Sequence, residues 1–311
     1  MFWEILIQAG FWAAAVRIAT TYLLGTLGEL LCERVGVLNL GIEGIMTVGA
    51  MAGWMWAYHT GDLWSAVLFA FFIGCMAGLL HAILTVFLGL SQHVSGIGIT
   101  LLLSSLSYYV FRMLLPSTTT PPKIMPFDEV EIPLLSDLPV IGEAFFNQSP
   151  MTYLAVGITL LFLYVLNRTP LGLALRLVGE NPAAADSQGI PVYLVRTGAV
   201  MVGSGLMAIG GAFLTLSHFD AFYFGMINGR GWICVALVIF ASWRPGKAFW
   251  GVILFAAIEA FQLRVKSITG GLPYQFYLML PYIVSILALV FLAKNAAYPR
   301  SLLIPYRRGE R

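Results

Sequence analysis

The sequence predicts an all-α polytopic membrane protein with about nine transmembrane helices and re-entrant or broken segments. Of the 311 residues, 59% are hydrophobic and only 10% are charged, whereas a soluble domain has about 25% charged residues. The mean hydropathy is +0.86, and apolar runs of about 20 residues, the length that crosses a bilayer, recur along the chain. This composition excludes an ordinary soluble enzyme. The near balance of 17 basic and 15 acidic residues gives no indication of a nucleic-acid partner.

Apolar runs bounded by charges, prolines or glycine clusters mark the candidate spans. They lie near residues 8–31, 42–58, 63–89, 94–114, 150–167, 194–216, 230–241, 248–265 and 276–294. The seventh run is too short to cross a bilayer alone. We expect all of them to form a single transmembrane domain over residues 1–311.

Charge is distributed unevenly among the connections. The connections rich in Lys and Arg, which short cytoplasmic loops retain, are residues 168–193, 242–247 and 295–311. The loop 115–149 instead carries five acidic residues and one lysine. We therefore expect this loop to be extracytoplasmic, with the N-terminus outside and the C-terminus in the cytoplasm. Arg264 and Lys266 then fall outside, against the rule, which leaves the number of spans open by one.

Two segments, 34–44 and 218–231, mix glycine and polar residues into apolar sequence. Irregular backbone at membrane depth survives only where protein or a watery cavity satisfies its N–H and C=O groups. Each segment is therefore a candidate lining of a transport pathway, and the entry to the fourth span at 95–100 has the same character. Because such breaks occur in both halves of the chain, they suggest a degenerate duplication of the kind that transporters use.

The segment 170–190 predicts a short capped helix on the cytoplasmic side. Asn181 suits the N-cap, Pro182 suits the first turn, three alanines follow, and Gly189 can close the helix. Two turns make a helix roughly 10 Å long. Its small face could fit a groove on a partner protein; the alternative is a solvated loop with incidental capping.

Motifs for catalysis, metal binding or nucleotide binding are missing from the sequence. The four histidines show no metal-ligand spacing, no nucleophile lies beside a base, and there is no G-x-x-x-x-G-K-[ST] phosphate loop. We therefore expect no cofactor and no metal. If transport is driven by ATP, the ATPase must be another polypeptide.

Three segments together resemble the permease subunits of ABC importers, in the family that serves ribose and other simple sugars, nucleosides and branched-chain amino acids. Residues 33–44 match the family's early hallmark, residues 170–190 look like its coupling loop, and residues 228–232 with 242–245 resemble its late motif. The similarity runs in order over about residues 20–295. The glutamate-arginine form of the first motif and the short chain look most like the smaller permease of nucleoside uptake systems.

The resemblance implies a type II ABC importer-like permease, without enzymatic activity, in a bacterial plasma (inner) membrane. Such a permease moves a small polar solute, here most readily a nucleoside, by alternating access; a simple sugar or a branched-chain amino acid is the alternative. The implied partners are an ATPase subunit with two fused nucleotide-binding modules, a second and larger homologous permease that completes a heterodimer, an extracytoplasmic lipid-anchored substrate-binding protein, and membrane lipid.

Two sets of site residues follow from the resemblance and the breaks. The ATPase contact is expected at Arg176, Gly179, Glu180, Asn181, Pro182, Ala183, Ala184 and Ala185. The substrate pathway is expected at Asn39, Glu43, Ser95, Tyr223, Asn228 and Trp232. As alternatives, Glu43 could cap a broken helix, Asn39 could satisfy a turn, and the aromatic rings could pack inside the bundle.

Two other classes of function remain open at this stage. A secondary transporter driven by an ion gradient would need intramembrane carboxylates such as Glu43 and Glu259. A membrane-embedded enzyme would show His, Asp or Glu clustered on facing spans, which the sequence lacks.

Overall fold

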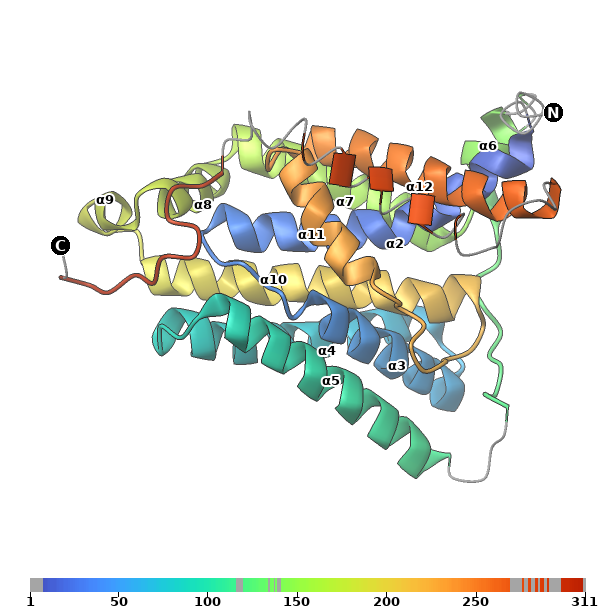
Figure 1. The fold of residues 1–311 in the computed structure, drawn as a ribbon, viewed down its shortest axis with the longest axis horizontal. Helices are drawn as coiled ribbons and strands as arrows, with labels where there is room; N and C mark the ends of the chain where they lie inside the picture. The colour runs from blue at the N-terminus through green and yellow to red at the C-terminus, as the bar shows by residue number, and fades with distance from the viewer. Residues whose placement is uncertain are drawn as a thin grey trace.

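The structure of the chain is a computed structural model and is mostly helical where it is described (Figure 1). The described residues are 8–115, 120–133, 135–136, 138, 141–268, 276, 279–280, 283–284, 286–287, 290 and 298–309. The longer helices are α2 (Ala9–Arg34), α3 (Ile42–Thr60), α4 (Leu63–Ala82), α5 (Gln92–Leu114), α7 (Pro150–Arg168), α10 (Val192–Phe213), α11 (Arg230–Phe240) and α12 (Pro245–Ile268).

The remaining elements are short. The π-helical turns η1 (Ile83–Phe87) and η2 (Leu214–His218) extend α4 and α10. Three short helices, α6 (Ile141–Phe146), α8 (Pro170–Glu180) and α9 (Pro182–Ser187), lie in the connections on either side of α7. The strands β1 (Val130–Glu131) and β2 (Asn147–Gln148) form one antiparallel pair, in which Val130 faces Gln148.

Eight of the nine expected spans coincide with described helices. Among the described residues, five helical segments are long and apolar enough to cross a membrane by length and composition: α2, α4 with η1, α5, α7, and α10 with η2. Helix α11 has 11 residues and is too short to span alone, as expected. The ninth expected span, 276–294, falls largely outside the described residues, so the number nine stays a prediction.

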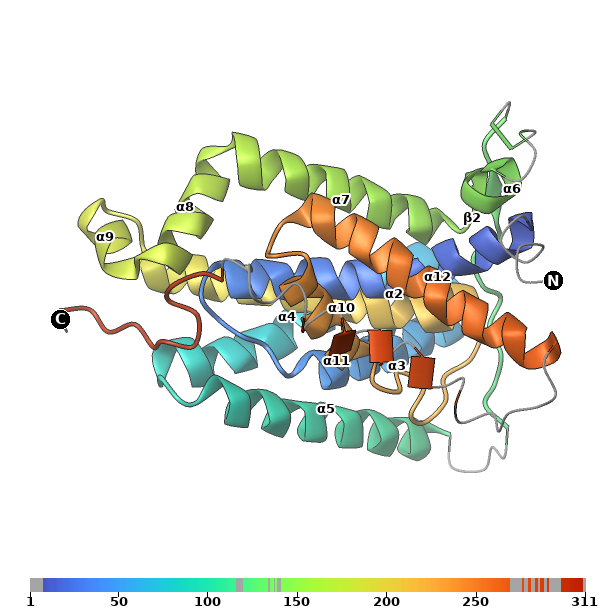
Figure 2. The same ribbon diagram turned by 45° about the horizontal axis from the view of Figure 1, so that its top comes forward.

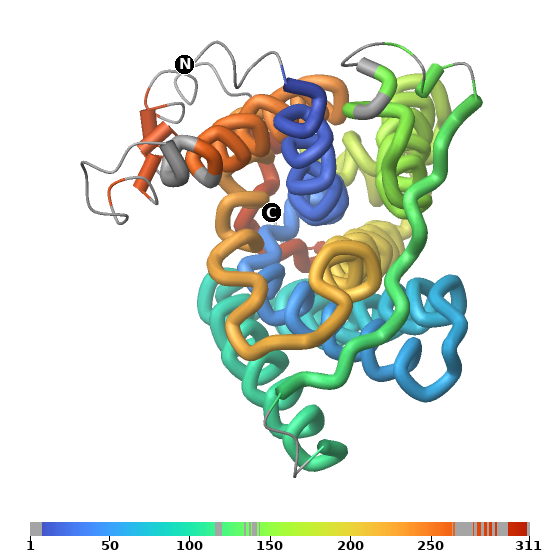
Figure 3. The backbone as a smooth tube through the Cα atoms, turned by 90° about the vertical axis from the view of Figure 1, so that its right-hand side faces the viewer, coloured from blue at the N-terminus to red at the C-terminus, as the bar shows by residue number. Residues whose placement is uncertain are grey.

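The centre of the bundle is the pair α2 and α10. In their most apolar windows, 83% of the α2 residues and 89% of the α10 residues are buried. Gly28 and Gly203 allow the two backbones to touch, because a Cβ atom on either glycine would collide with the other helix's carbonyl oxygen. Figure 3 shows the other helices arranged around this pair.

The two ends of the bundle differ in charge. We call one the α8–α9 end; it holds η1, α8, α9, the α11–α12 turn and residues 298–309 (Figure 1). Its basic residues are Arg34, Arg168, Arg176, Arg196, Arg244, Lys247, Arg300, Arg307 and Arg308. The opposite end, which we call the α6 end, is mixed, with the acidic residues Asp62, Asp128, Glu129 and Glu131 and the basic residues Arg17, Arg112, Lys123 and Arg264.

Two connections leave an end of the bundle and turn back into it. Residues 35–41, the first return, lead from the α8–α9 end into α3, and residues 219–229, the second return, lead from the α6 end into α11 (Figures 1 and 2). Helices α3 and α11 therefore both begin inside the bundle. Their N-terminal ends are in direct contact.

Candidate functional site

The first turn of α3 is joined to the start of α11 by Glu43. The N–H of Gly229 donates to Glu43 Oε1 at 2.7 Å, and the N–H of Gly231 donates to Glu43 Oε2 at 2.8 Å. Gly229 has φ +84°, and a Cβ atom on Gly231 would lie 2.7 Å from Glu43 Oε2, so the sequence needs glycine at both positions. One carboxylate thus satisfies two N–H groups at a helix start, where the helix dipole also favours negative charge. Glu43 caps the broken helix α11.

The second return and the first turn of α11, which holds Trp232, present polar and aromatic side chains at the surface. Asn228 is exposed, and Tyr223 and Trp232 are 39% and 41% exposed, so these rings do not simply pack inside the bundle. The return is attached to α5, because the N–H of Gly225 donates to Tyr108 Oη at 3.0 Å. These three side chains are therefore open to a ligand or a partner chain.

Asn39 lies within the packed protein and not on an open surface. It is 0% exposed, its Nδ2 donates to Ser204 Oγ at 3.0 Å, and its Oδ1 accepts from the N–H of Gly41 at 3.1 Å. Its backbone N–H donates to Glu29 Oε1 at 2.9 Å. Asn39 therefore satisfies the turn of the first return, which is the alternative expected for it, and its place on the substrate pathway stays a prediction.

Ser95 is also nearly buried. Its side chain is 8% exposed and borders an apolar cavity of about 530 Å³ between α4 and α5. The next residue, Gly96, has no room for a Cβ atom, which would lie 2.8 Å from Leu40 Cβ. The start of α5 therefore packs closely against the first return.

An ion pair beside the second return was not selected from the sequence. Arg230 Nη2 lies 3.3 Å from Glu259 Oε1, and Tyr22 Oη donates to Glu259 Oε2 at 2.7 Å. The sequence marks Glu259 as an intramembrane carboxylate that needs a partner, but nothing in it indicates Arg230 as that partner. Among the described residues, no group of three or more His, Cys, Asp or Glu could hold a metal ion.

The coupling segment contains the expected capped helix. Asn181 Oδ1 accepts from the N–H of Ala184 at 3.0 Å, Pro182 stands in the first turn, and α9 ends before Gly189, which has φ +79°. Two residues of the expected ATPase contact are buried: Ala185 is 0% exposed, and a Cβ atom on Gly179 would collide with a carbonyl of α2. Both therefore pack within the chain, and Arg176 is half-buried against a cavity.

The described C-terminal segment holds the coupling segment against the bundle. Ser301 Oγ donates to the carbonyl of Gly179 at 2.6 Å, and Arg196, which is 1% exposed, donates from Nη2 to Ser301 Oγ at 3.1 Å. Arg308 pairs with Asp186 of α9 at 3.1 Å. The orientation of α9 is thus set by the end of the chain as well as by its own cap.

Comparison with known proteins agrees with this architecture. Residues 12–289 match the family described as the permease component of branched-chain amino acid transport systems. The chain is 31% identical to the guanosine ABC transporter permease protein NupQ of Bacillus subtilis, with 96% of each chain covered. It is 32% identical to the nucleoside ABC transporter permease protein NupC of Lactococcus lactis, with 91% of this chain and 92% of that protein covered.

A third relative is named for another solute. The Haloferax volcanii protein TsgC13, described as a candidate glucose ABC transporter permease, is 39% identical, with 85% of this chain and 80% of that protein covered. No solved structure matches the chain. The resemblance inferred from the three sequence motifs is confirmed. The chain belongs to this family of membrane-embedded ABC transporter permeases.

Proposed function

We propose that this chain is the smaller permease subunit of an ATP-driven importer and moves a nucleoside across a bacterial plasma membrane by alternating access. The observation that carries the proposal is the meeting of α3 and α11 at Glu43 inside the bundle. Discontinuous helices of this kind bring polar backbone to membrane depth, where a polar solute can be bound. The nucleoside permeases among the relatives support this choice of solute.

The solute-facing residues in this proposal are Tyr223, Asn228 and Trp232. Aromatic faces can stack on a base, and an amide can exchange hydrogen bonds with a base edge or a ribose hydroxyl. Glu43 positions them by binding the backbone of Gly229 and Gly231, while Asn39 and Ser95 support the first return. The same side chains could bind a sugar, and the similarity to TsgC13 favours glucose as the second candidate.

The α8–α9 end faces the cytoplasm in this proposal, with the N-terminus outside, because basic residues gather there and short cytoplasmic loops retain them. The ATPase contact is then Glu180, Asn181, Pro182, Ala183 and Ala184, the expected residues from the end of α8 onward that are not buried. The half-buried Arg176 lies inside α8 and lines a cavity. The ATPase has two fused nucleotide-binding modules, the larger permease completes a heterodimer, and a lipid-anchored binding protein delivers solute at the α6 end.

Uptake by the assembled complex in proteoliposomes tests the solute and the energy source. We expect labelled guanosine to enter only with ATP on the ATPase side, and to keep entering when an ionophore collapses the proton gradient. Trp232→Ala should raise the KM for guanosine, while Trp64→Ala, another half-exposed tryptophan, should not. Glucose uptake without guanosine uptake would identify a sugar permease. Uptake that survives without ATP and stops with the ionophore would identify a gradient-driven carrier.

The coupling surface is tested by co-purification of the ATPase with the tagged chain. Ala183→Glu adds a charge at an exposed position in the first turn of α9, and we expect it to release the ATPase. Gln188→Glu adds the same charge at an exposed position just after α9 and should retain it. Equal retention by both variants would contradict the proposed contact.

A further inference from the structure

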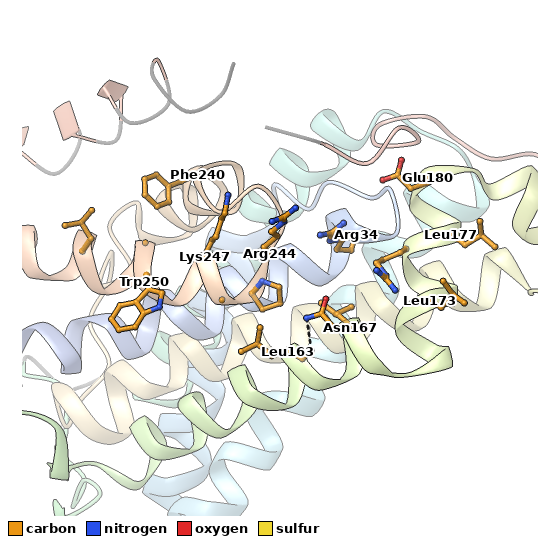
Figure 4. A pocket seen from close by; sticks show the side chains of 16 residues that line it. Arg34, Leu163, Asn167, Leu173, Leu177, Glu180, Phe240, Arg244, Lys247 and Trp250 are labelled. Atoms are coloured by element: carbon orange, nitrogen blue, oxygen red, sulfur yellow. Dashed lines mark hydrogen bonds between the residues drawn. The ribbon is translucent and has the colours of Figure 1, made fainter. Parts of the chain in front are cut away.

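A cavity of about 1260 Å³ opens at the α8–α9 end, between α7, α8 and the α11–α12 turn (Figure 4). Its basic lining residues are Arg34, Arg176, Arg244 and Lys247. The one acidic lining residue, Glu180, is exposed. The cavity therefore concentrates positive charge in a confined space.

Within the described part of the chain, Glu180 is the one carboxylate that lines the cavity beside these four cations. No ion pair joins any of them to a described carboxylate. Arg34 and Arg176 are half-buried and held by backbone carbonyls: Arg34 Nε donates to the carbonyl of Trp243 at 2.8 Å, and Arg176 Nε to that of Gly172 at 3.3 Å. Their remaining guanidinium N–H groups are available to an acceptor. Like charges gathered in a partly desolvated space repel each other, so this cavity favours an anion.

The walls of the same cavity are apolar. They are formed by Leu163, Leu166, Leu173, Leu177, Phe240, Trp250 and Leu254. Several of them face outward: Leu173 is 60% exposed, Trp250 is 69% exposed and Leu254 is 54% exposed. A free anion would satisfy the cations but make no use of the apolar walls. An amphiphile would satisfy the charged and the apolar parts together.

The position of the charges fits a membrane surface. Arg34 is the last residue of α2, and Arg244 and Lys247 stand at the turn where α12 begins. The walls continue along α7 and α12, where Leu163 and Trp250 lie inside the helices and line the same cavity (Figure 4). Basic pockets between transmembrane helices on the cytoplasmic side suit acidic lipid headgroups.

We propose that this cavity binds one anionic phospholipid, with its phosphate against Arg34, Arg176, Arg244 and Lys247 and an acyl chain along the apolar walls of α7 and α12. Arg176 then serves the lipid and not the ATPase. The site lies beyond the transport function and rests on it only in one respect, that the α8–α9 end lies at the membrane surface. Because α8 leads directly into α9, the bound lipid would also brace the coupling segment.

Lipid binding to the purified full-length chain in mild detergent tests the site. Native mass spectrometry would count phosphatidylglycerol and phosphatidylcholine molecules with identical acyl chains, whatever the transport activity. We expect one phosphatidylglycerol to be preferred. The double variant Arg244→Gln with Lys247→Gln, at two exposed positions, should bind it about thirtyfold more weakly, since each basic residue contributes about fivefold. Arg168→Gln with Arg300→Gln removes two charges from the same end outside the cavity and should bind as the wild type does.

Three results would overturn the proposal. The first is equal binding of the two lipids, or no change in the double variant. The second is displacement of phosphatidylglycerol by millimolar inorganic phosphate, which would indicate a site for a free anion. The third is loss of the lipid when the ATPase is added, with Lys247 cross-linking to it, which would make the cavity a contact for an acidic protein segment. Phosphatidylglycerol with brominated acyl chains should quench part of the tryptophan fluorescence of the wild type, and Trp250→Phe should lose that quenched part. The same degree of quenching in both proteins would also count against the acyl-chain placement.

Discussion

The first and second returns break helices in the same bundle but are held very differently. The first return is mostly buried, and side chains of α5, α4 and α2 bind its backbone. From α5, Gln92 Oε1 accepts from the N–H of Leu38 at 2.7 Å, and Thr100 Oγ1 donates to the carbonyl of Leu40 at 2.9 Å. His81 and Glu29 complete this shell. In the second return, Asn228 and the 223–225 stretch are exposed.

This difference teaches how one chain can use two breaks for two purposes. A return whose polar groups are satisfied by buried side chains can only be a fixed support, because each lost bond would leave an orphan group inside the membrane. The second return is anchored by buried residues such as Phe222 and Ile227, and the exposed side chains between them can face a solute. Glu43 lies at the joint, since it belongs to the helix after the first return and caps the helix after the second.

The largest effect is expected at the fixed return. Asn39→Ala removes the partners of Ser204 and Gly41 in a fully buried place and should lower the free energy of unfolding by about 3 kcal/mol. Asn228→Ala, the same change in the second return, should cost only about 1 kcal/mol, for placing alanine at φ +49°. Thermal unfolding midpoints in one detergent measure both. Equal midpoints would erase the distinction between the returns.

At the joint, Glu43→Ala should destabilise the protein by about 2 kcal/mol, because two N–H groups at the start of α11 lose their acceptor. Glu43→Gln keeps one acceptor oxygen and should lose about half as much. We expect uptake to fall in the same order. If the glutamine variant is as defective as the alanine variant, the charge at the helix ends matters more than the hydrogen bonds.

A smaller effect is expected for Glu259→Gln, about 1 kcal/mol, because Arg230 keeps its bonds to backbone carbonyls when the carboxylate is neutralised. ATP-driven uptake should persist in this variant. Arg17→Gln breaks the more exposed pair with Glu129 and should change the unfolding midpoint little. Complete loss of uptake in a Glu259→Gln protein that still folds would revive the gradient-driven carrier.

Much of this architecture could be predicted from local sequence patterns, because the residues that determine it are close together in the sequence. Asn181 and Ala184 are three positions apart, so the cap of α9 could be predicted from composition and order alone. Eight of the expected spans matched described helices for a similar reason, since a hydrophobic run can be recognised without its neighbours in space. The family resemblance added the order of the motifs.

Contacts between distant positions could not be predicted in this way. The bond of Tyr22 to Glu259 joins residues 237 positions apart, and no periodicity in either helix indicates the other. The burial of Gly179 and Ala185 depends on the end of α2 and on the chain packed around α9. A small residue in a loop can mean an exposed contact or a tight packing point, and only the tertiary structure distinguishes the two.

The smallest change in stability, and the sharpest test of the second return, is expected from Asn228→Gly. Asn228 has φ +49°, a conformation that glycine adopts without strain. The free energy of unfolding should therefore change by no more than about 0.5 kcal/mol. The variant removes the amide side chain and leaves the backbone free to keep its path. If that amide binds the solute, the KM for guanosine should rise about tenfold, as for the loss of one good hydrogen bond, with little change in kcat. An unchanged KM in a protein with an unchanged midpoint would exclude Asn228 from solute binding and leave Tyr223 and Trp232 as the solute-facing residues.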